Sequence, residues 1–562
     1  MTSEDGRYVI VYNGEIFNYV ELRKELESIG CRFRSRSDTE VLLTAYSTWG
    51  EKCLDRLNGM FSFVLYDTVE RTIFGARDRF GIKPFYYYHD DRVFIFASEI
   101  PAVLSVLPGR AEPDNVSIYD YLVFNRTDQN ENTFFRGIKK LQHACSFTLK
   151  GSDLRIKKWY DLREKSVEPF TDHDEYLDLF KDAASIRLRS DVPVGGCLSG
   201  GLDSSSIVSV LVKYFGREDL ATFSAIYGEG ITGDESPYIN EYKSLLGNMH
   251  YCSPDAGSLI QDKEKFVRAH GEPVPSTAPY AHFKVMELAQ NNVVVTLDGQ
   301  GADEQLAGYH YFFGFYFKEL LRQVRWIRLM RESAGYLKTH RSLYGIKTLG
   351  YFMLPGNLKN RARVLEKNYL DGDFVREYGG QNTIASSLYA SDGLQDALFN
   401  HFDYKLEHLL KWEDRNSMWF SLESRVPFLD YRLVEKTLAL PAGQIINRGQ
   451  TKYILRQSMK GILPEAVRTR TDKIGFLTPE DSWFRTPVFE QYVKDLVRSE
   501  SFRERGFFDT KKVEARYSAH LSGRENLSKE IWKWINLELW FRQFIDSPVR
   551  SAGKHSMAYH AG

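Results

Sequence analysis

The sequence of 562 residues is poor in the features that mark secreted, membrane and metal-binding proteins. Its five cysteines are scattered, and no two stand at the spacing of a metal site or of a disulfide framework. Its 13 histidines form no HExxH motif, and no apolar run approaches the ~20 residues of a membrane helix. No charged segment followed by an apolar core opens the chain, so we expect no signal peptide. These absences predict a cytoplasmic protein without zinc and without a transmembrane segment.

The chain also lacks an excess of charge of either sign. Lysine and arginine total 74, aspartate and glutamate total 75, and the formal net charge is −1 at pH 7. Because positive and negative charges are so evenly balanced, we exclude bulk binding to nucleic acid. The chain is longer than a single hydrophobic core supports, so we expect more than one domain.

The most informative segment is residues 199–205, which read Ser-Gly-Gly-Leu-Asp-Ser-Ser between an apolar run and a helical pattern. This order predicts a strand, a glycine turn and a helix. Glycines let the backbone wrap closely around a phosphate, which the N–H groups and the dipole of the helix attract. The predicted phosphate contacts are Ser199, Gly200, Gly201, Ser204 and Ser205.

Asp203 has a different role in this loop. An ionised carboxylate donates no hydrogen bond to phosphate but suits Mg²⁺, which takes one or two carboxylates plus phosphate oxygens. A pair of glycines is by itself often a plain tight turn, and a loop without lysine is not a Walker A motif. The full heptad resembles the pyrophosphate loop of the ATP pyrophosphatases. That resemblance implies cleavage of ATP between its α- and β-phosphates.

The first 150 residues alternate strand-like and helical segments. A β-rich run from residue 8 ends in Asn13-Gly14, a dipeptide that signals a turn. Helices are expected at residues 20–29 and after the capping residues 37–40. Further strands are expected at residues 60–66, 72–76, 85–88 and 93–97. This order predicts a domain of layered helices and sheets.

Several motifs of this region occur in the order of one known family. They read YNGEIFN, SDTE, RLNGMFSFVLYD, ARDRFGIKPFYY and ASEI. Together they resemble the glutaminase domain of class II glutamine amidotransferases. With the phosphate loop behind them, residues 5–540 resemble the glutamine-hydrolysing asparagine synthetase family. The resemblance implies that Asn13 and Gly14 form an oxyanion hole and that Glu15 and Asp38 bind the α-amino group of glutamine. The alternatives are a hairpin turn at Asn13-Gly14 and a helix cap at Asp38.

One departure from the family concerns the nucleophile. The family uses an N-terminal cysteine whose free amine acts as a base, whereas this sequence begins Met-Thr-Ser-Glu at a point that matches the family's interior. Cys31 and Cys53 have no terminal amine and cannot substitute. We therefore expect a truncated glutaminase domain over residues 1–150 that does not hydrolyse glutamine. A misplaced start codon, a clipped gene and a natural ammonia-dependent form are the explanations considered.

From residue 172 the pattern changes to long helices and short apolar strands. A helix at 174–189 and strands at 222–227 and 293–297 suit a buried parallel sheet with helical crossovers. ATP is then expected at the carboxyl ends of the strands, where open α/β sheets bind ligands. The resemblance implies nucleotide contacts at Leu198, Ser199, Ala225, Asp298 and Gly299. The synthetase domain is expected over 172–545 and a disordered tail over 546–562.

A second glycine-rich loop, LDGQGADEQLAGY, follows the last of these strands. The resemblance makes Asp303 a second Mg²⁺ carboxylate opposite Asp203, and two such groups would offset the charge on the leaving pyrophosphate. A plain flexible turn is the alternative. In the reference members of the family the middle residue of the Gly-x-Gly triplet is an acid that deprotonates the attacking ammonia. Gln300 stands there, and a neutral amide cannot accept a proton.

Three carboxylates are candidates to replace the acid missing at Gln300, namely Asp298, Glu304 and Glu423. The sequence does not choose among them. The LDGQGADE version of the loop also resembles family members associated with surface-polysaccharide gene sets. A sugar carboxylate is therefore an alternative acceptor to aspartate.

Further motifs lie downstream. Glu423 and Arg425 stand in a segment similar to the family's VRVPFLD and are candidates for acceptor binding, with a structural salt bridge as the alternative. Lys452 and Lys473 match family lysines, and we expect Lys473 to contact pyrophosphate, since a compact ammonium is a good phosphate partner. Residues 322–367 are basic with interleaved aromatics. They predict a solvated helical insertion or a docking surface for an anionic acceptor or a membrane.

The predicted fold is α/β and α+β in two domains. The first is a truncated αββα glutaminase domain of the N-terminal-nucleophile type, and the second is a helix-rich α/β ATP-pyrophosphatase domain with a parallel sheet. The predicted reaction is ATP- and Mg²⁺-dependent amidation of a carboxylate through an acyl-adenylate, from aspartate to asparagine. Glutamine or ammonia supplies the nitrogen, and a homodimer is possible.

Three other functions stay open at this point. The first is amidation of a uronic acid or similar glycan carboxylate. The second is ring closure of the kind that the related β-lactam synthetases perform. The third is a non-catalytic remnant that acts as a binding partner, against which the intact loop with Asp203 and Asp303 argues.

Overall fold

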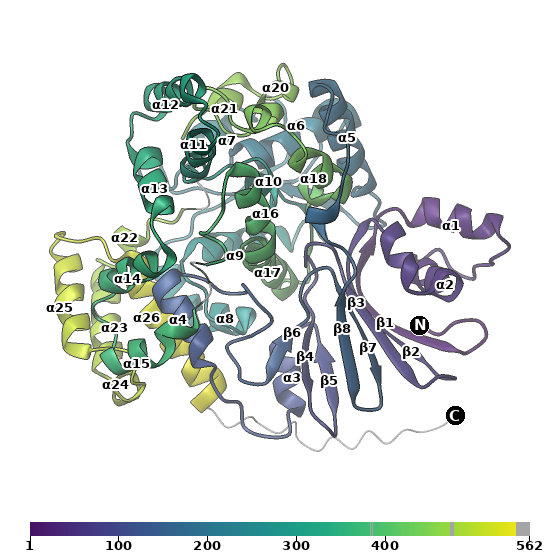
Figure 1. The fold of residues 1–562 in the computed structure, drawn as a ribbon, viewed down its shortest axis with the longest axis horizontal. Coiled ribbons are helices and arrows are strands. Elements are labelled where there is room, and N and C mark those ends of the chain that lie inside the picture. The colour runs from purple at the N-terminus through teal and green to yellow at the C-terminus, as the bar shows by residue number, and fades with distance from the viewer. Residues whose placement is uncertain (383, 385, 473–476, 547–562) are drawn as a thin grey trace.

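The computed structural model describes residues 1–382, 384, 386–472 and 477–546. Antiparallel sheets form the N-terminal part, which is purple to blue in Figure 1, and a parallel sheet wrapped in helices forms the rest. This arrangement confirms the predicted fold class. The predicted contact Lys473 and, beyond Asp546, the predicted tail lie outside the described residues.

Four layers of helix and sheet make up the N-terminal part. Helices α1 and α2 share a core with one face of a five-stranded sheet, ordered β1-β2-β3-β7-β8. A three-stranded sheet, ordered β5-β4-β6, packs on the other face, and α3 contacts it from outside. The elements are β1 (Tyr8–Ile16), α1 (Tyr19–Ser28), α2 (Asp38–Trp49), β2 (Gly59–Asp67), β3 (Thr72–Arg77), β4 (Tyr86–His89), β5 (Phe94–Ala97), α3 (Ile100–Val106), α4 (Asn115–Phe124), β6 (Ile138–Lys140), β7 (Cys145–Lys150) and β8 (Asp153–Lys158).

The turn predicted at Asn13-Gly14 is wrong. Both residues lie within β1 and pair in register with Ser62 and Phe61 of β2. At Gly14 the backbone takes a φ of +153°, and an added Cβ would lie 2.1 Å from the carbonyl oxygen of Met60. Residue 14 is therefore glycine because the facing strand approaches too closely for a side chain, and not because the chain reverses there.

The parallel sheet has the order β11-β10-β9-β12-β13. Its strands are short, buried in the middle and connected by helices, as the apolar runs predicted. The elements are α5 (His173–Ile186), β9 (Val194–Cys197), α6 (Leu202–Phe215), β10 (Thr222–Ala225), α7 (Ser236–Asn240), β11 (Met249–Cys252), α8 (Ala256–His270), α9 (Ala278–Ala289), β12 (Val295–Leu297), α10 (Ala302–Gln305), α11 (Phe312–Arg322) and β13 (Glu423–Arg425).

The other elements of the described residues are mainly helices. Between β12 and β13 lie α12 (Trp326–His340), α13 (Tyr344–Met353), α14 (Gly356–Glu366), α15 (Gly372–Tyr378), α16 (Leu394–Tyr404) and α17 (Leu406–Trp419). After β13 come α18 (Tyr431–Leu438), α19 (Ala442–Ile445), α20 (Tyr453–Ser458), α21 (Glu465–Thr469), α22 (Glu480–Trp483), α23 (Pro487–Arg498), α24 (Glu500–Glu504), α25 (Thr510–Leu521) and α26 (Ser528–Trp540). Among the described residues, no helix is long and apolar enough to cross a membrane.

The two parts of the chain meet along α17, which lies near the middle of Figure 1. Glu407 of this helix pairs with Arg77 of β3 and, at 3.2 Å, with Lys140 of β6. One turn or two further on, Lys411 pairs with Asp128 at 2.5 Å and Asp414 pairs with Lys83 at 3.0 Å. All of these side chains are buried, so the ion pairs are shielded from solvent.

Candidate active site

The two glycine-rich loops meet at the carboxyl edge of the parallel sheet. The first follows β9 and leads into α6, and the second follows β12 and leads into α10. The strand order reverses between β9 and β12, and open α/β sheets bind ligands at such a point. A Cβ at Gly299 would lie 3.0 Å from the Cβ of Asp203. The loops approach so closely that a side chain at this position would force the neighbouring backbone of Asp203 and Ser204 to shift.

The first loop has the geometry of an anion site. The backbone at Gly200 takes a φ of +76°. The Ser204 hydroxyl accepts a hydrogen bond from the Ser199 N–H at 3.2 Å and lies 3.0 Å from the Ser199 hydroxyl. No side chain caps α6 at Gly201, which leaves the first N–H groups of this helix available to an anion.

A cavity of about 280 Å³ lies between the two loops. Eight of the predicted residues line it, four from the first loop (Ser199, Gly201, Asp203 and Ser204) and four from the second (Asp298, Gly299, Gln300 and Asp303). Two predicted phosphate contacts do not line it, since Ser205 is fully buried and the carbonyl of Gly200 accepts a hydrogen bond from Arg470 at 2.8 Å. Arg456 lines the cavity and was missed by the sequence analysis.

A smaller hollow adjoins this cavity and shares Ser199 with it. Leu198, Ser199 and Ala225, the three residues predicted to lie near adenosine, all line the hollow. Phe223, Tyr227 and Val285 add apolar and aromatic surface. The structure thus brings together the residues predicted for the nucleoside, and their role remains a prediction.

Asp203 and Asp303 converge on a single positive charge. The ammonium of Lys452 lies 2.6 Å from both carboxylate oxygens of Asp203 and 2.5 Å from Oδ1 of Asp303. Two carboxylates within reach of one cation, beside the uncapped N-terminus of α6, are a donor set that fits Mg²⁺. The sequence predicted the pair of carboxylates but not the lysine that bridges them.

Gln300 faces an acid that the sequence analysis overlooked. Its Nε2 donates a hydrogen bond to Oε2 of Glu413, at 3.1 Å. Glu413 lies on α17 and also lines the cavity. Its Oε1 accepts a hydrogen bond from Ser424 at 2.8 Å and lies 3.3 Å from Nε2 of His282.

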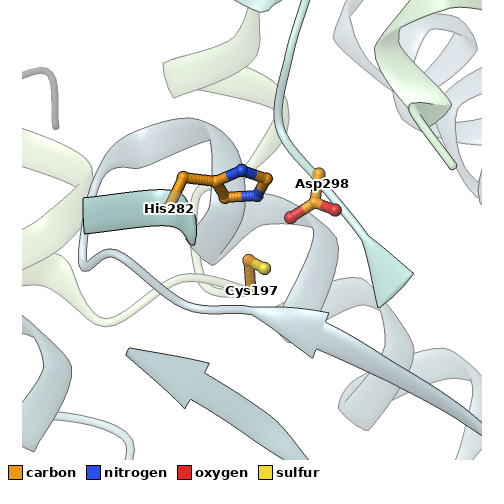
Figure 2. A group of neighbouring side chains, drawn as sticks. All are labelled: Cys197, His282 and Asp298. Atoms are coloured by element: carbon orange, nitrogen blue, oxygen red, sulfur yellow. The ribbon is translucent and has the colours of Figure 1, made fainter. Parts of the chain in front are cut away.

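A buried group of Cys197, His282 and Asp298 lies beside Glu413. Figure 2 shows the three side chains turned toward one another, with their polar atoms within 4.8 Å. Oδ2 of Asp298 accepts a hydrogen bond from Thr296 at 2.8 Å and lies 2.7 Å from the Ser424 hydroxyl, whose single hydrogen it shares with Glu413. Because hydrogen bonds already hold this carboxylate, we assign no metal to the group.

The surroundings of Asp298 and Glu413 shift the pKa values of these two acids in opposite directions. Burial and the neighbouring charge of Glu413 raise the pKa of Asp298 to about 7. Burial also acts to raise the pKa of Glu413, but the His282 ring and the hydrogen bonds outweigh it and lower that pKa to about 2. Glu413 is thus the group that stays ionised at neutral pH.

The predicted glutamine-binding residues lie together around β1. Nδ2 of Asn13 donates to Ser98 at 2.9 Å, and Oδ2 of Asp38 accepts from Tyr12 at 2.8 Å. Burial and the charge of Asp38 raise the pKa of Glu15 to about 7. The side chain that caps α2 is Ser37, so Asp38 is not the helix cap of the alternative interpretation. Binding of glutamine here stays a prediction.

Glu423 and Arg425 stand apart from the cavity. Nε of Arg425 lies 2.6 Å from Glu423, and Nη2 lies 3.6 Å from Glu15 of the N-terminal part. Neither residue lines the cavity between the loops. The salt bridge of the alternative interpretation is therefore present, and acceptor binding by these residues stays a prediction.

The basic segment forms α12, α13 and α14 at the surface. At the start of α12, Trp326 and Ile327 are 54% and 81% exposed, and Met330 follows at 64%. Arg325 and Arg331 flank them and are also exposed. The segment is helical and solvated, which agrees with the first of its two predicted interpretations.

The antiparallel layered part and the parallel sheet with its two glycine-rich loops correspond to the two domains of an amidotransferase-type ligase, which the family models identify. The asparagine synthase family model matches residues 175–542, and the glutamine amidotransferase domain model matches residues 1–160. The chain belongs to the asparagine synthetase family and is a carbon–nitrogen ligase.

Curated relatives match most of the chain. Asparagine synthetase [glutamine-hydrolyzing] 3 of Bacillus subtilis (strain 168) is 32% identical over 484 residues, which are 84% of this chain and 75% of the relative. Asparagine synthetase [glutamine-hydrolyzing] 1 of the same strain is 30% identical over 556 residues, 96% of this chain and 86% of the relative. Amidase chry2 of Gibberella zeae is 24% identical and covers 93% of this chain and 85% of the relative.

A solved structure of glutamine phosphoribosylpyrophosphate amidotransferase from B. subtilis is similar over 41% of this chain and 48% of that chain, at 16% identity and a TM-score of 0.21. So weak a likeness adds nothing to the fold described above.

Proposed function

We propose that this ligase uses ATP to amidate the side-chain carboxylate of aspartate, giving asparagine, with glutamine or ammonia as the nitrogen source. The relatives named as asparagine synthetases support this assignment. The observation that carries it is the meeting of the two glycine-rich loops, where Asp203 and Asp303 share the ammonium of Lys452. Such an arrangement suits a nucleotide that arrives with a divalent cation.

In the first proposed step, the acceptor carboxylate attacks the α-phosphorus of ATP, which forms an acyl-adenylate and releases pyrophosphate. The first N–H groups of α6 and the hydroxyls of Ser199 and Ser204 hold phosphate oxygens. When bound, Mg²⁺ supplies positive charge next to the leaving pyrophosphate, and Asp203 and Asp303 would hold it. Arg456 adds charge on the cavity wall, since its hydrogen bonds go to carbonyl oxygens and not to carboxylates. In the second step, ammonia displaces AMP.

The test is pyrophosphate release with ATP, MgCl₂ and ammonium chloride, with and without aspartate. We expect release that depends on aspartate, with one asparagine formed for each pyrophosphate. Asp203→Ala should abolish release, whereas Asp219→Ala, at an exposed position beyond the C-terminal end of α6, should not. A parallel arm with glutamine in place of ammonium tests the nitrogen source. Protein that binds ATP but shows no aspartate-dependent release would contradict aspartate as the acceptor.

A glycan carboxylate is the second candidate acceptor. Two observations favour it, namely Gln300 at the position of the usual acid and the exposed basic and apolar surface at the start of α12. One of the relatives is also named an amidase and not an asparagine synthetase. A panel of uronic acids and acidic oligosaccharides, tested beside aspartate for acceptor-dependent pyrophosphate release, decides between the two.

A further inference from the structure

The cavity needs a proton acceptor for the proposed amide-forming step. Ammonia that attacks an acyl carbon carries an extra proton until a base removes it, and the amide of Gln300 cannot do so. Gln300 does, however, hold a carboxylate through its hydrogen bond to Glu413. The following inference rests on the proposed function and concerns the same cavity.

Position distinguishes the carboxylates that could remove this proton. Of the three that the sequence suggested, Glu304 and Glu423 do not line the cavity. Glu304 accepts a hydrogen bond from Tyr309 at 2.6 Å, and Glu423 pairs with Arg425. Of the five carboxylates among the described residues that line the cavity, Asp203 and Asp303 share Lys452 and Asp472 pairs with Arg470, which leaves Asp298 and Glu413 as candidates.

Hydrogen bonding distinguishes Asp298 from Glu413. Oδ2 of Asp298 accepts a hydrogen bond from Thr296 and lies 2.7 Å from the Ser424 hydroxyl, and neither contact involves Gln300. Oε2 of Glu413 accepts from Gln300, and a carboxylate oxygen keeps a second lone pair beside one such bond. Glu413 is therefore both in contact with the triplet residue and able to accept a proton.

The hydrogen-bond partners of His282 determine which of its ring nitrogens carries the proton that faces Glu413. Nδ2 of Asn416 donates to the carbonyl of Pro279 at 2.9 Å and, with its other hydrogen, to Nδ1 of His282 at 3.1 Å. Oδ1 of Asn416 lies 3.1 Å from Nε2 of His270, which donates to it. This network leaves the proton of a neutral His282 on Nε2, facing Oε1 of Glu413 at 3.3 Å.

We propose that Glu413 is the catalytic proton acceptor of amide formation and that Gln300 is its positioning residue. The lone pair of ammonia forms a C–N bond to the acyl carbon of the acyl-adenylate. The bond between that carbon and the phosphate oxygen breaks, and AMP leaves with the electron pair. The extra proton on nitrogen passes to Oε2 of Glu413, which yields the neutral amide. The carboxylate thus comes from α17, while the usual triplet position supplies only a hydrogen bond.

The experiment measures the two half-reactions separately in Glu413→Gln. Acceptor-dependent exchange of pyrophosphate into ATP reports adenylation, and amide formation with ammonium reports the second step. We expect exchange within about threefold of wild type and amide formation reduced by about 10²-fold, the usual contribution of a positioned base. The isosteric control Asp298→Asn should reduce amide formation by less than Glu413→Gln does.

Two further variants protect the test against misfolding. Gln300→Met removes the hydrogen bond without removing a charge, and we expect it to slow amide formation while exchange persists. Gln300→Glu in the Glu413→Gln background restores an acid from the loop side, and we expect it to recover at least tenfold of the lost amide formation. A purely structural role for Glu413 would not produce this recovery.

The outcomes are distinguishable. If wild type forms amide and Glu413→Gln forms it equally fast, or if Asp298→Asn alone abolishes it, Glu413 is not the acceptor. If Glu413→Gln loses exchange and amide formation in equal proportion and Gln300→Glu recovers neither, the residue is structural. If wild type shows no exchange with any carboxylate, the proposed function fails, and the role of Glu413 fails with it.

Discussion

Replacing Lys452 by methionine should leave the carboxylates of Asp203 and Asp303 without the cation between them, so that they repel each other. The ammonium of Lys452 is shared by Asp203 and Asp303, whose side chains are only 15% and 16% exposed. Removing one partner of a buried ion pair costs about 3–5 kcal/mol, and the partial exposure here lowers this to about 2–3 kcal/mol. We expect the melting temperature without metal to fall by about 2–4 °C, because the entropy of unfolding grows with the length of the chain.

Magnesium should reverse this loss. In wild-type protein the ammonium already satisfies both carboxylates, so MgCl₂ alone should shift the melting temperature little. In Lys452→Met the two carboxylates present an open anionic site, and MgCl₂ should recover about 1–3 kcal/mol when it is present well above its Kd. Thermal melts followed by fluorescence, with MgCl₂ titrated in the absence of nucleotide, measure both effects.

A matched control separates this effect from the general loss of a buried lysine. Lys367 forms a mostly buried ion pair with Glu530 at 2.5 Å, and neither residue lines the cavity between the glycine-rich loops. Lys367→Met should lose stability in the same way but should not respond to MgCl₂. An equal response to MgCl₂ in wild type, Lys452→Met and Lys367→Met would refute the idea that Asp203 and Asp303 form a cation site.

Three further predictions concern packing and charge elsewhere. Burial opposes ionisation of Glu407, but Arg77 and neighbouring charges lower the pKa of this carboxyl to about 2. The ionised carboxylate therefore contributes about 3 kcal/mol to the free energy of unfolding, which is present above pH 4.5 and is lost as the pH falls toward 2. The difference in melting temperature between wild type and Glu407→Gln should shrink over that window, and a difference independent of pH would contradict this. Gly299→Ala should force the glycine-rich loops apart at Asp203 and lower pyrophosphate release at least tenfold, and wild-type rates in that variant would show that the loops need not approach so closely. Gly14→Ala should cost about 1–3 kcal/mol because the facing strand leaves no room for a methyl group, as urea unfolding would reveal; an unchanged midpoint would show that the strands can separate freely.

The local pattern of apolar residues, glycines and helix formers was sufficient to predict many of the strands and helices. The strands predicted at 60–66 and 72–76 are β2 and β3, and the strand–glycine–helix order around residues 199–205 is present as β9 and α6. The prediction failed at Asn13-Gly14, because a glycine that permits close packing of strands looks the same in sequence as one that permits a turn. It also missed β7 and β8, which are joined by a short turn at Gly151.

The candidate site was predictable where its residues are close in sequence. Asp203 and Asp303 each follow a strand, and adjacent strands bring them together. Glu413 could not be found in this way, because it reaches Gln300 from a helix 113 positions further along the chain. Its only local signal is an acid in a helix rich in buried polar residues, which by itself does not say what the acid contacts. Lys452 was noted as a family lysine, but its place between two aspartates depends on the tertiary fold.

The position of α17 has a mechanical consequence. On one side of this helix Glu407, Lys411 and Asp414 are held by buried charges of the antiparallel half, and on the other Glu413 and Asn416 border the cavity. Rotating the helix to move one set would leave the ions of the other set buried without partners. A hinge motion of the two halves at this boundary would therefore break the buried ion pairs of α17. A disturbance on the antiparallel side instead reaches the cavity as a small rigid-body displacement of α17. Other contacts also join the halves, among them Asn58 with Asp430 and Arg189 with Glu21, but α17 is the helix that carries both buried ion pairs to the antiparallel half and residues of the cavity wall.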